Sequence, residues 1–302
     1  MILPYLLRLL CLAFASFFLV HATLASCVRL LSSKAVKSAG NMRPRNAAWF
    51  LLGFRLLPAL LGLFIVLAIC VPGYLWLEPE ATAEQVSMAF VIAGIFGAAI
   101  WMVSLRRVAR AVAGSMAFTR RTRGEAESED HIGHYSRTIV VEGAAPVLAL
   151  AGVLRPRLVI SRGVLEALPD EEMEVALRHE IAHRTSSDNL KRLLLLLAPE
   201  PLPGMRMFQA LDRAWSRYTE WAADDRAVAG DSQRSLSLAS ALLRVARMGA
   251  APRTSALMTS LVAGDSDLSA RVDRLLLREP PREAPVSRLS VFAGGAGLVV
   301  LG

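Results

Sequence analysis

Three long apolar stretches, separated by charged segments, occupy the first third of the chain. They run from Leu9 to Val28, from Ala47 to Leu77 and from Val86 to Leu105. A helix needs roughly 20 apolar residues to cross the hydrocarbon core of a bilayer, so each stretch is long enough to span it. The pattern predicts a membrane domain of three transmembrane helices over residues 1–105.

Three residues interrupt the apolar pattern of these predicted spans. We expect His21 to be a tolerated polar residue inside the first span, Arg55 to snorkel toward the membrane surface, and Pro58 to kink the second span. A cleaved signal peptide is an alternative for the first stretch. It would place the next, strongly basic segment outside the cytoplasm, against the positive-inside rule.

The charged segments alternate in sign along the chain. Residues 29–46 carry basic side chains and no acid, residues 78–84 carry three glutamates, and arginines follow the third stretch from Arg106 onward. By the positive-inside rule the N-terminus lies outside and residues 106–288 are cytoplasmic. This arrangement predicts a multi-pass protein of a bacterial-type inner membrane. The apolar residues 289–302 could begin a fourth transmembrane helix or form a docked tail.

Composition agrees with a membrane protein. Of the 302 residues, 54% are hydrophobic, and the formal net charge is +8. Positive-inside segments account for the basic excess, and no basic stripe interleaved with aromatic residues is present, so no nucleic-acid partner is expected. The lipid bilayer is the expected surrounding. None of the three cysteines lies near a polar candidate for chemistry, which argues against thiol catalysis.

The segment after residue 105 has a mixed pattern. Short β-branched or aliphatic runs at Thr138–Val141, Val147–Leu150 and Leu158–Ser161 predict a small antiparallel sheet. Helical periodicity follows, with one helix opening at Pro169 and Asp170. The acidic run Gly124–Asp130 reads as a connector. The predicted fold class is therefore α+β: N-terminal transmembrane helices followed by a mainly helical domain with a small antiparallel sheet.

The candidate chemistry lies in one of these predicted helices, at His179-Glu180-Ile181-Ala182-His183. Two histidines at i and i+4 lie on one face of a helix, so both imidazoles can reach one zinc ion. The glutamate after the first histidine can act as general base toward a water molecule. His179 and His183 are therefore candidate metal ligands, and Glu180 is the candidate catalytic residue.

A catalytic zinc site needs a third protein ligand. A metzincin would place glycine at 186 and histidine at 189, where this chain has Ser186 and Asn189. A later predicted helix, Met205–Ala229, places Glu220 and Asp224 at i and i+4. We expect Glu220 to be the third zinc ligand and Asp224 to orient a ligating histidine through a hydrogen bond.

These motifs resemble the M56 family of membrane zinc metallopeptidases, the protease module of beta-lactam-sensing transducers, and more distantly the M48 family. The resemblance covers most of the chain. It rests on the three preceding spans and on a set of short motifs: Arg157–Gly163, the HExxH helix, Asp188-Asn189-Leu190, Glu220 with Asp224, and a later helix with Leu268, Arg271, Val272 and Leu275.

The resemblance implies a gluzincin-type metallopeptidase domain with one zinc ion per chain, held by His179, His183 and Glu220. It also implies regulated cleavage of a partner protein, such as a transcriptional repressor or a membrane protein. The sensing transducers carry a large extracellular ligand-binding domain after the last span. The sequence ends at Gly302, so antibiotic sensing is not expected.

Other functions remain open from the sequence alone. A non-proteolytic membrane signalling or scaffold protein with a structural metal site is the main alternative, although such a site would be closed by four protein ligands. A transporter is a weaker alternative, because the spans lack inverted repeats and acids at mid-membrane. An oxyanion stabiliser cannot be assigned; Tyr135, His131 and His134 are candidates by residue type.

Overall fold

The computed structural model describes residues 4–78, 86–124, 126–132, 135–142, 146–153, 156–202, 206–249, 257–261 and 265–277. Within these residues the protein is mostly helical and contains one small mixed sheet. The possible fourth transmembrane helix at residues 289–302 lies outside the described residues, as does His134, one of the candidate oxyanion stabilisers. The division into domains at residue 105 stays a prediction.

Three helices are long and apolar enough to cross a membrane, as the hydrophobic pattern predicts. They are α1 (Tyr5–Gly40), the nearly continuous helix formed by α2 (Pro44–Ile65), η1 (Val66–Cys70) and α3 (Val71–Leu77), and α4 (Met88–Gly124). Each is longer than the apolar stretch that predicts it. The basic segment 29–46 is therefore helical as far as Gly40, and α4 continues well past Leu105.

The irregularity of the second span is not at Pro58. The α-helix continues through Pro58, and the wider π-helical turn η1 lies instead at residues 66–70. It directly precedes Pro72, whose ring lacks an N–H donor and would clash with a carbonyl in a regular α-helical turn.

The five-stranded sheet has the order β1-β2-β4-β3-β5. Its strands are β1 (Ala126–Ile132), β2 (Tyr135–Val141), β3 (Leu148–Ala151), β4 (Arg157–Ser161) and β5 (Met258–Ser260). The prediction of a purely antiparallel sheet is wrong, because β2 and β4 are parallel. The next strand along the chain, β3, does not pair with β2. Strand β4 lies between them, parallel to β2 and antiparallel to β3. The prediction of a connector at 124–130 is also wrong, since most of this segment is β1.

Both faces of this sheet are covered. Alternate residues of its central strands enter one core with helices α5 (Arg162–Ala167), α6 (Asp170–Ser186), α9 (Ser232–Arg247) and α10 (Asp265–Leu276). The other residues form a second cluster against Phe118 of α4. Every residue of β3 is consequently buried, which explains its uninterrupted apolar sequence.

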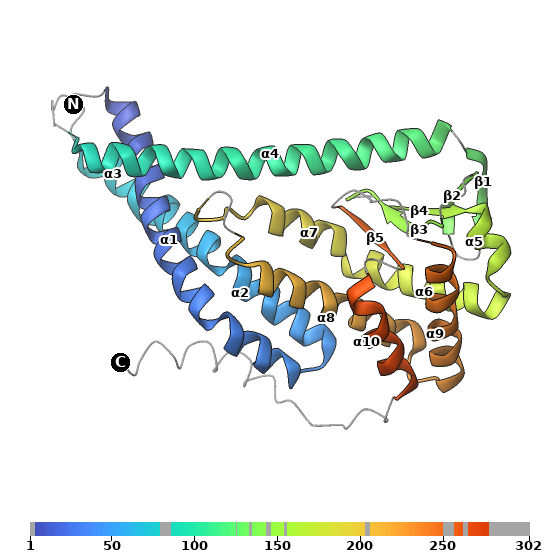
Figure 1. Cartoon of the computed structure of the whole chain (residues 1–302). Helices are drawn as coiled ribbons and strands as arrows, with labels where there is room; N and C mark the ends of the chain where they lie inside the picture. The colour runs from blue at the N-terminus through green and yellow to red at the C-terminus, as the bar shows by residue number, and fades with distance from the viewer. Residues whose placement is uncertain are drawn as a thin grey trace.

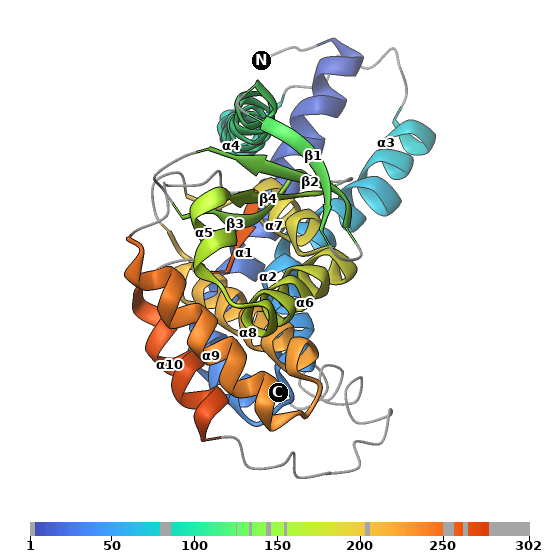
Figure 2. The same cartoon turned by 90° about the vertical axis from the view of Figure 1, so that its right-hand side faces the viewer.

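The remaining helices join the sheet to the spans. Helix α7 (Asp188–Leu197) lies between α4 and α2, and α8 (Gln209–Val228) runs alongside α2 (Figure 1). Phe208, Leu211 and Trp215 share a buried cluster with residues of α1 and α2. The view of Figure 2 shows α6 and α8 below the sheet, with α9 and α10 on their outer side. The candidate site therefore lies between a sheet domain and the long apolar helices.

Candidate metal centre

Helix α6 carries the two candidate histidines and the candidate base. It begins at Asp170, with three acidic residues in its first turn, where the helix dipole favours negative charge. Val175 and Ala176 are buried in the core against the sheet. The same helix buries His179, Glu180 and His183, with exposed fractions of 0%, 0% and 1%. Since α6 is closely packed from both sides, these polar side chains are held in fixed positions.

Helix α8 supplies the carboxylates that face α6. Glu220 and Asp224 are one turn apart and almost fully buried. The C-terminal turn of α8 is anchored by Ala227 and Val228 in the core of the sheet domain. The helix begins at Gln209, four residues later than the sequence predicts. The prediction that Glu220 and Asp224 share one helix face is confirmed.

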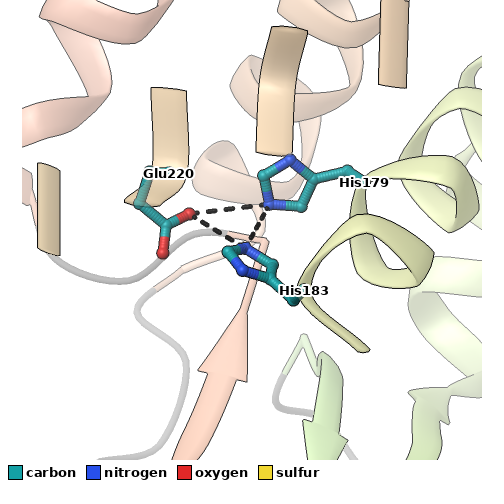
Figure 3. Close-up of side chains that lie close together, drawn as sticks. All are labelled: His179, His183 and Glu220. Atoms are coloured by element: carbon teal, nitrogen blue, oxygen red, sulfur yellow. Dashed lines mark hydrogen bonds and ion pairs between the residues drawn. The ribbon is translucent and has the colours of Figure 1, made fainter. Parts of the chain in front are cut away.

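Three side-chain atoms converge between α6 and α8. The Nε2 atoms of His179 and His183 are 3.0 Å apart, and Glu220 Oε2 lies 3.5 Å from each of them. Figure 3 shows both imidazoles pointing toward the Glu220 carboxylate. Within the described residues this buried cluster could bind a metal ion.

The cluster fits zinc by its donor atoms and their spacing. Zinc–nitrogen and zinc–oxygen bonds of roughly 2.0–2.2 Å at tetrahedral angles place ligand atoms about 3.3 Å apart, close to the three distances observed. Neither carboxylate oxygen of Glu220 has a hydrogen-bond partner, although both are buried. Two imidazole nitrogens that face each other beside a carboxylate without a hydrogen bond are a donor set that a cation would satisfy, although Arg192 and Arg271 each lie 3.5 Å from that carboxylate.

Each candidate histidine ligand has a carboxylate beside its other ring nitrogen. Asp224 Oδ1 lies 2.9 Å from His179 Nδ1, and Asp188 Oδ2 lies 2.8 Å from His183 Nδ1. A proton held on Nδ1 in each ring leaves the Nε2 lone pair directed at the cluster, which is the tautomer that metal binding requires. The predicted position of Asp224 beside a histidine is thus observed.

The two orienting carboxylates are themselves neutralised by cations. Arg271 of α10 donates two hydrogen bonds to Asp224, at 2.7 and 2.9 Å, and a third to the Leu261 carbonyl. Lys191 of α7 donates a hydrogen bond to Asp188 Oδ1 at 2.8 Å, leaving Oδ2 to face His183. Since Arg271 is almost fully buried, its charge acts on the cluster with little screening by water.

Sequence reasoning assigns no role to Asp188 beyond the family resemblance, although Asp188 is as close to the cluster as Asp224. The reason lies at Ser187, which adopts the left-handed conformation (φ 54°) between α6 and α7. This turn brings the first residue of α7 back beside His183. Asn189 then fixes the turn, donating to the carbonyls of Leu150 and Gly152 at the end of β3. An acid five residues after a histidine does not by itself predict such a contact.

Burial and neighbouring charges have opposite effects on the pKa values of the cluster. Burial disfavours the charged form of His183, but the negative charges and hydrogen bonds of Glu220 and Asp188 outweigh it and raise the pKa of His183 to about 10. Burial likewise disfavours ionised Asp224, but Arg271 and His179 hold the pKa of Asp224 down at about 2. Asp224 is therefore anionic at neutral pH, whereas the raised pKa of His183 means that this imidazole releases a proton when a metal binds.

Glu180 differs from Asp188, Glu220 and Asp224 in the direction of its pKa shift, which is upward where theirs is downward. Both of its carboxylate oxygens are buried and lack a hydrogen-bond partner. Burial raises the pKa of this carboxyl to about 7, although the neighbouring histidines act in the opposite direction. Glu180 is thus a desolvated carboxylate, free of protein hydrogen bonds, one residue away from a candidate ligand.

The candidate oxyanion stabilisers are not brought to the site by any described contact. The backbones of His131 and Tyr135 lie at the adjoining ends of β1 and β2, where Ile132 pairs with Tyr135. A cation that the sequence analysis does not single out is closer: Arg192 Nη2 lies 3.5 Å from Glu220 Oε1. Its position one turn after Asp188 on α7 becomes apparent only once α7 is placed.

None of the protein-family models matches this sequence, and comparison with curated proteins gives no match.

Proposed function

We propose that the protein is a membrane-bound zinc metalloendopeptidase that hydrolyses peptide bonds of a partner protein in regulated signalling. The observation that carries the proposal is the position of Glu180. Its buried carboxylate has no hydrogen-bond partner and lies next to the cluster of two histidines and a glutamate. The resemblance of the same residues to the M56 family supports the proposal.

In this function His179, His183 and Glu220 hold the zinc. Three protein ligands are the usual set of a catalytic zinc, whereas a structural zinc usually has four. Zinc bound there would supply Lewis-acid polarisation of the scissile carbonyl and increase the acidity of an attacking water.

The remaining steps belong to side chains of the chain. Glu180 accepts a proton from the attacking water on a carboxylate oxygen and delivers it to the leaving amine. Asp224 and Asp188 keep the two imidazoles in one tautomer and one orientation. Arg271 keeps Asp224 ionised while it does so.

The three long apolar helices support a multi-pass location, and the charge alternation supports an inner membrane with the catalytic domain in the cytoplasm. A cytoplasmic site suits a protein substrate such as a transcriptional repressor or another membrane protein. The bilayer itself surrounds the spans.

The test compares Glu180→Gln with Glu174→Gln, an exposed acid on the same helix. Both variants and the parent are purified in detergent, and zinc content is measured beside cleavage of casein and of the chain itself. We expect Glu180→Gln to retain one zinc per chain and to lose cleavage, and Glu174→Gln to retain both.

Full cleavage by Glu180→Gln would refute the proposed base. If the parent protein binds zinc but cleaves neither casein nor itself, the result would favour the signalling or scaffold function with a structural metal. Loss of zinc from Glu180→Gln would give this residue a structural role instead of a catalytic one.

A further inference from the structure

Helix α7 presents an apolar surface that its own fold does not cover. Its five consecutive leucines, 193–197, are all at least partly exposed, and only Asp188 and Asn189 of this helix are buried. Successive residues of an α-helix are turned by about 100° from one another, so five leucines surround the helix and one core cannot bury them all. A helix that is apolar on all sides requires apolar surroundings on more than one side.

Contacts near both ends of α7 join it to the three long apolar helices. The Ala198 carbonyl accepts a hydrogen bond from Arg107 of α4 at 3.4 Å, and the Pro199 carbonyl lies 3.1 Å from His21 Nε2 of α1. Near the start of α7, Lys191 lies 4.6 Å from the ring centre of Trp49 on α2. The helix therefore has a defined depth relative to the apolar spans.

This depth can be counted from the opposite end of the bundle. The rings of Tyr5 and Tyr74 pack together there, with 5.0 Å between their centres. From that level, a hydrocarbon core about 30 Å thick takes roughly 20 residues of helix, which leads to the neighbourhood of Ala25 on α1 and Phe54 on α2. His21, the partner of Pro199, lies about one helical turn inside this boundary.

The third span gives the same level. A side chain at Gly97 of α4 would collide with the backbone of Phe14 on α1, so these residues lie side by side. Ten residues further along the two helices, Arg107 is level with Leu24. The C-terminal end of α7 thus meets α1 and α4 near the inner edge of the hydrocarbon core, whereas the Asp188 end points away from it.

The exposed leucines of this region continue the outer surfaces of the neighbouring spans. Leu194 is 41% exposed and Leu202 is 43% exposed. Helices α2 and α4 both contact α7, and by the same count of residues their exposed apolar side chains at this depth are Leu57, Leu60, Met102 and Leu105. Trp49 and Lys191, which lie further toward the predicted cytoplasmic side, form the aromatic and basic pair typical of a membrane–water interface.

We propose that the leucines of α7, with Leu202, form a lipid-binding surface that inserts among the acyl chains of the inner leaflet. The occupant is lipid rather than another protein, because the surface is continuous with the exposed sides of two spans and has an interfacial pair at its outer limit. The ten residues of α7 measure roughly 15 Å, so the metal cluster beside Asp188 lies within about that distance of the hydrocarbon. The inference rests on the membrane location in the proposed function and is independent of peptidase activity.

The test uses spin labels on single cysteines in the full chain, with Cys11, Cys27 and Cys70 replaced by alanine and the protein in phosphatidylcholine–phosphatidylglycerol nanodiscs. Labels are placed through Leu194→Cys and Leu202→Cys. Leu60→Cys on α2 is the lipid control. Leu236→Cys is the matched aqueous control, because Leu236 is a 52%-exposed leucine on α9, away from the spans.

We expect labels at 194 and 202 to be relaxed by dissolved oxygen and protected from a water-soluble nickel chelate, as at 60, while the label at 236 shows the opposite. Nickel accessibility at 194 and 202 equal to that at 236 would overturn the proposal. Protection from both reagents, with spin–spin broadening, would overturn it in favour of contact with a second copy.

A second measurement keeps the cysteines native. Leu194→Glu should lower the apparent Tm in nanodiscs more than Leu236→Glu does, because a carboxylate at position 194 would enter hydrocarbon. Equal Tm shifts for the two variants would count against lipid contact. Peptidase activity does not enter either readout, so failure of the inference and failure of the proposed enzyme are separable.

Discussion

Helix α8 connects two buried charged clusters that differ in how their hydrogen-bonding capacity is used. Near its N-terminus, Arg55 of the second span pairs with Asp212 and Glu200, each at 3.2 Å, and its guanidinium lies 4.0 Å from the centre of the Phe208 ring. Two turns later, Glu220 faces two histidines, and its carboxylate oxygens have no hydrogen-bond partner.

The difference separates a structural contact from a candidate binding site. The Arg55 cluster pairs one cation with two acids, and the planar guanidinium stacks on an aromatic ring, so each charged group has a partner within the protein. The metal cluster places several lone pairs toward one point, which is unfavourable for the protein alone and favourable for a cation. Buried charge by itself does not identify a functional site; unsatisfied buried acceptors that converge do.

The largest expected effect is at the metal cluster. Glu220→Ala removes one of three ligands, so we expect the purified protein to lose its zinc together with any cleavage activity. Metal content by mass spectrometry checks this, with Asp225→Ala, the adjacent acid after Asp224 that pairs with Arg274, as the matched control. Zinc retained at one per chain in Glu220→Ala would show that another residue is the third ligand.

Substitution in the Arg55 cluster should lower the stability of the protein and leave metal binding unchanged. Arg55→Met removes a buried cation and leaves Glu200, whose side chain is 14% exposed, without its partner. Loss of one partner of a buried pair typically costs about 3 kcal/mol or more, whereas the 41%-exposed side chain of Asp212 remains hydrated and adds little. We expect a large decrease in apparent Tm in detergent. Arg213→Met changes an exposed arginine of α8 and should have little effect. An unchanged Tm for Arg55→Met would mean that the ion pairs contribute nothing to the fold.

A smaller effect is expected where an acid acts on the metal through a histidine. Asp224→Asn keeps the shape of the side chain but removes the charge beside His179 Nδ1. Such changes typically weaken metal binding roughly 10–100-fold. Competition with a chromophoric chelator measures the affinity, and Asp225→Asn is the control. A zinc affinity equal to the parent's would remove Asp224 from the site.

The smallest effect concerns a half-exposed ion pair outside both clusters. Glu172 accepts hydrogen bonds from Ser240 and Arg244 of α9, which lower its pKa against the opposing effect of burial. A lowered folded-state pKa contributes stability above the unfolded pKa, and this contribution disappears as the pH falls through the folded pKa.

Glu172→Gln should therefore lower the apparent Tm slightly at neutral pH, and much less once the pH is below the lowered folded-state pKa of Glu172, where this carboxyl is protonated in both states. Glu174→Gln provides the control on the same helix. A Tm difference that stays constant between the two pH values would show that charge is not its cause.

Several features could be predicted from the sequence because they depend on local periodicity. The three spanning helices follow from runs of apolar residues, and the common face of His179 and His183 follows from helical spacing. Glu220 is predictable because its helix is amphipathic and a third ligand is chemically required. In each case the prediction depends on the spacing of residues within one helix, or on the number of ligands that a zinc ion needs.

Features that depend on how distant segments meet could not be predicted. Arg55 is expected to snorkel, but it pairs inside the protein with Glu200, from the segment between α7 and α8, and with Asp212 of α8. The partner of His183 depends on the left-handed turn at Ser187, and the parallel pairing of β2 with β4 depends on the order in which strands join the sheet. These are properties of the tertiary arrangement and leave no periodic signal.

The continuity of α8 makes metal binding and span packing linked quantities. One rigid helix begins beside the partner of Arg55, Asp212, and carries Glu220 eight residues later. If a rearrangement of the membrane helices displaced α8, the affinity of the cluster for its cation would change. Thermodynamic reciprocity then requires the bound cation to shift the equilibrium of the membrane helices by the same free energy. Binding of a cation to the cluster would thus change the arrangement of the long apolar helices, although the cation does not contact them.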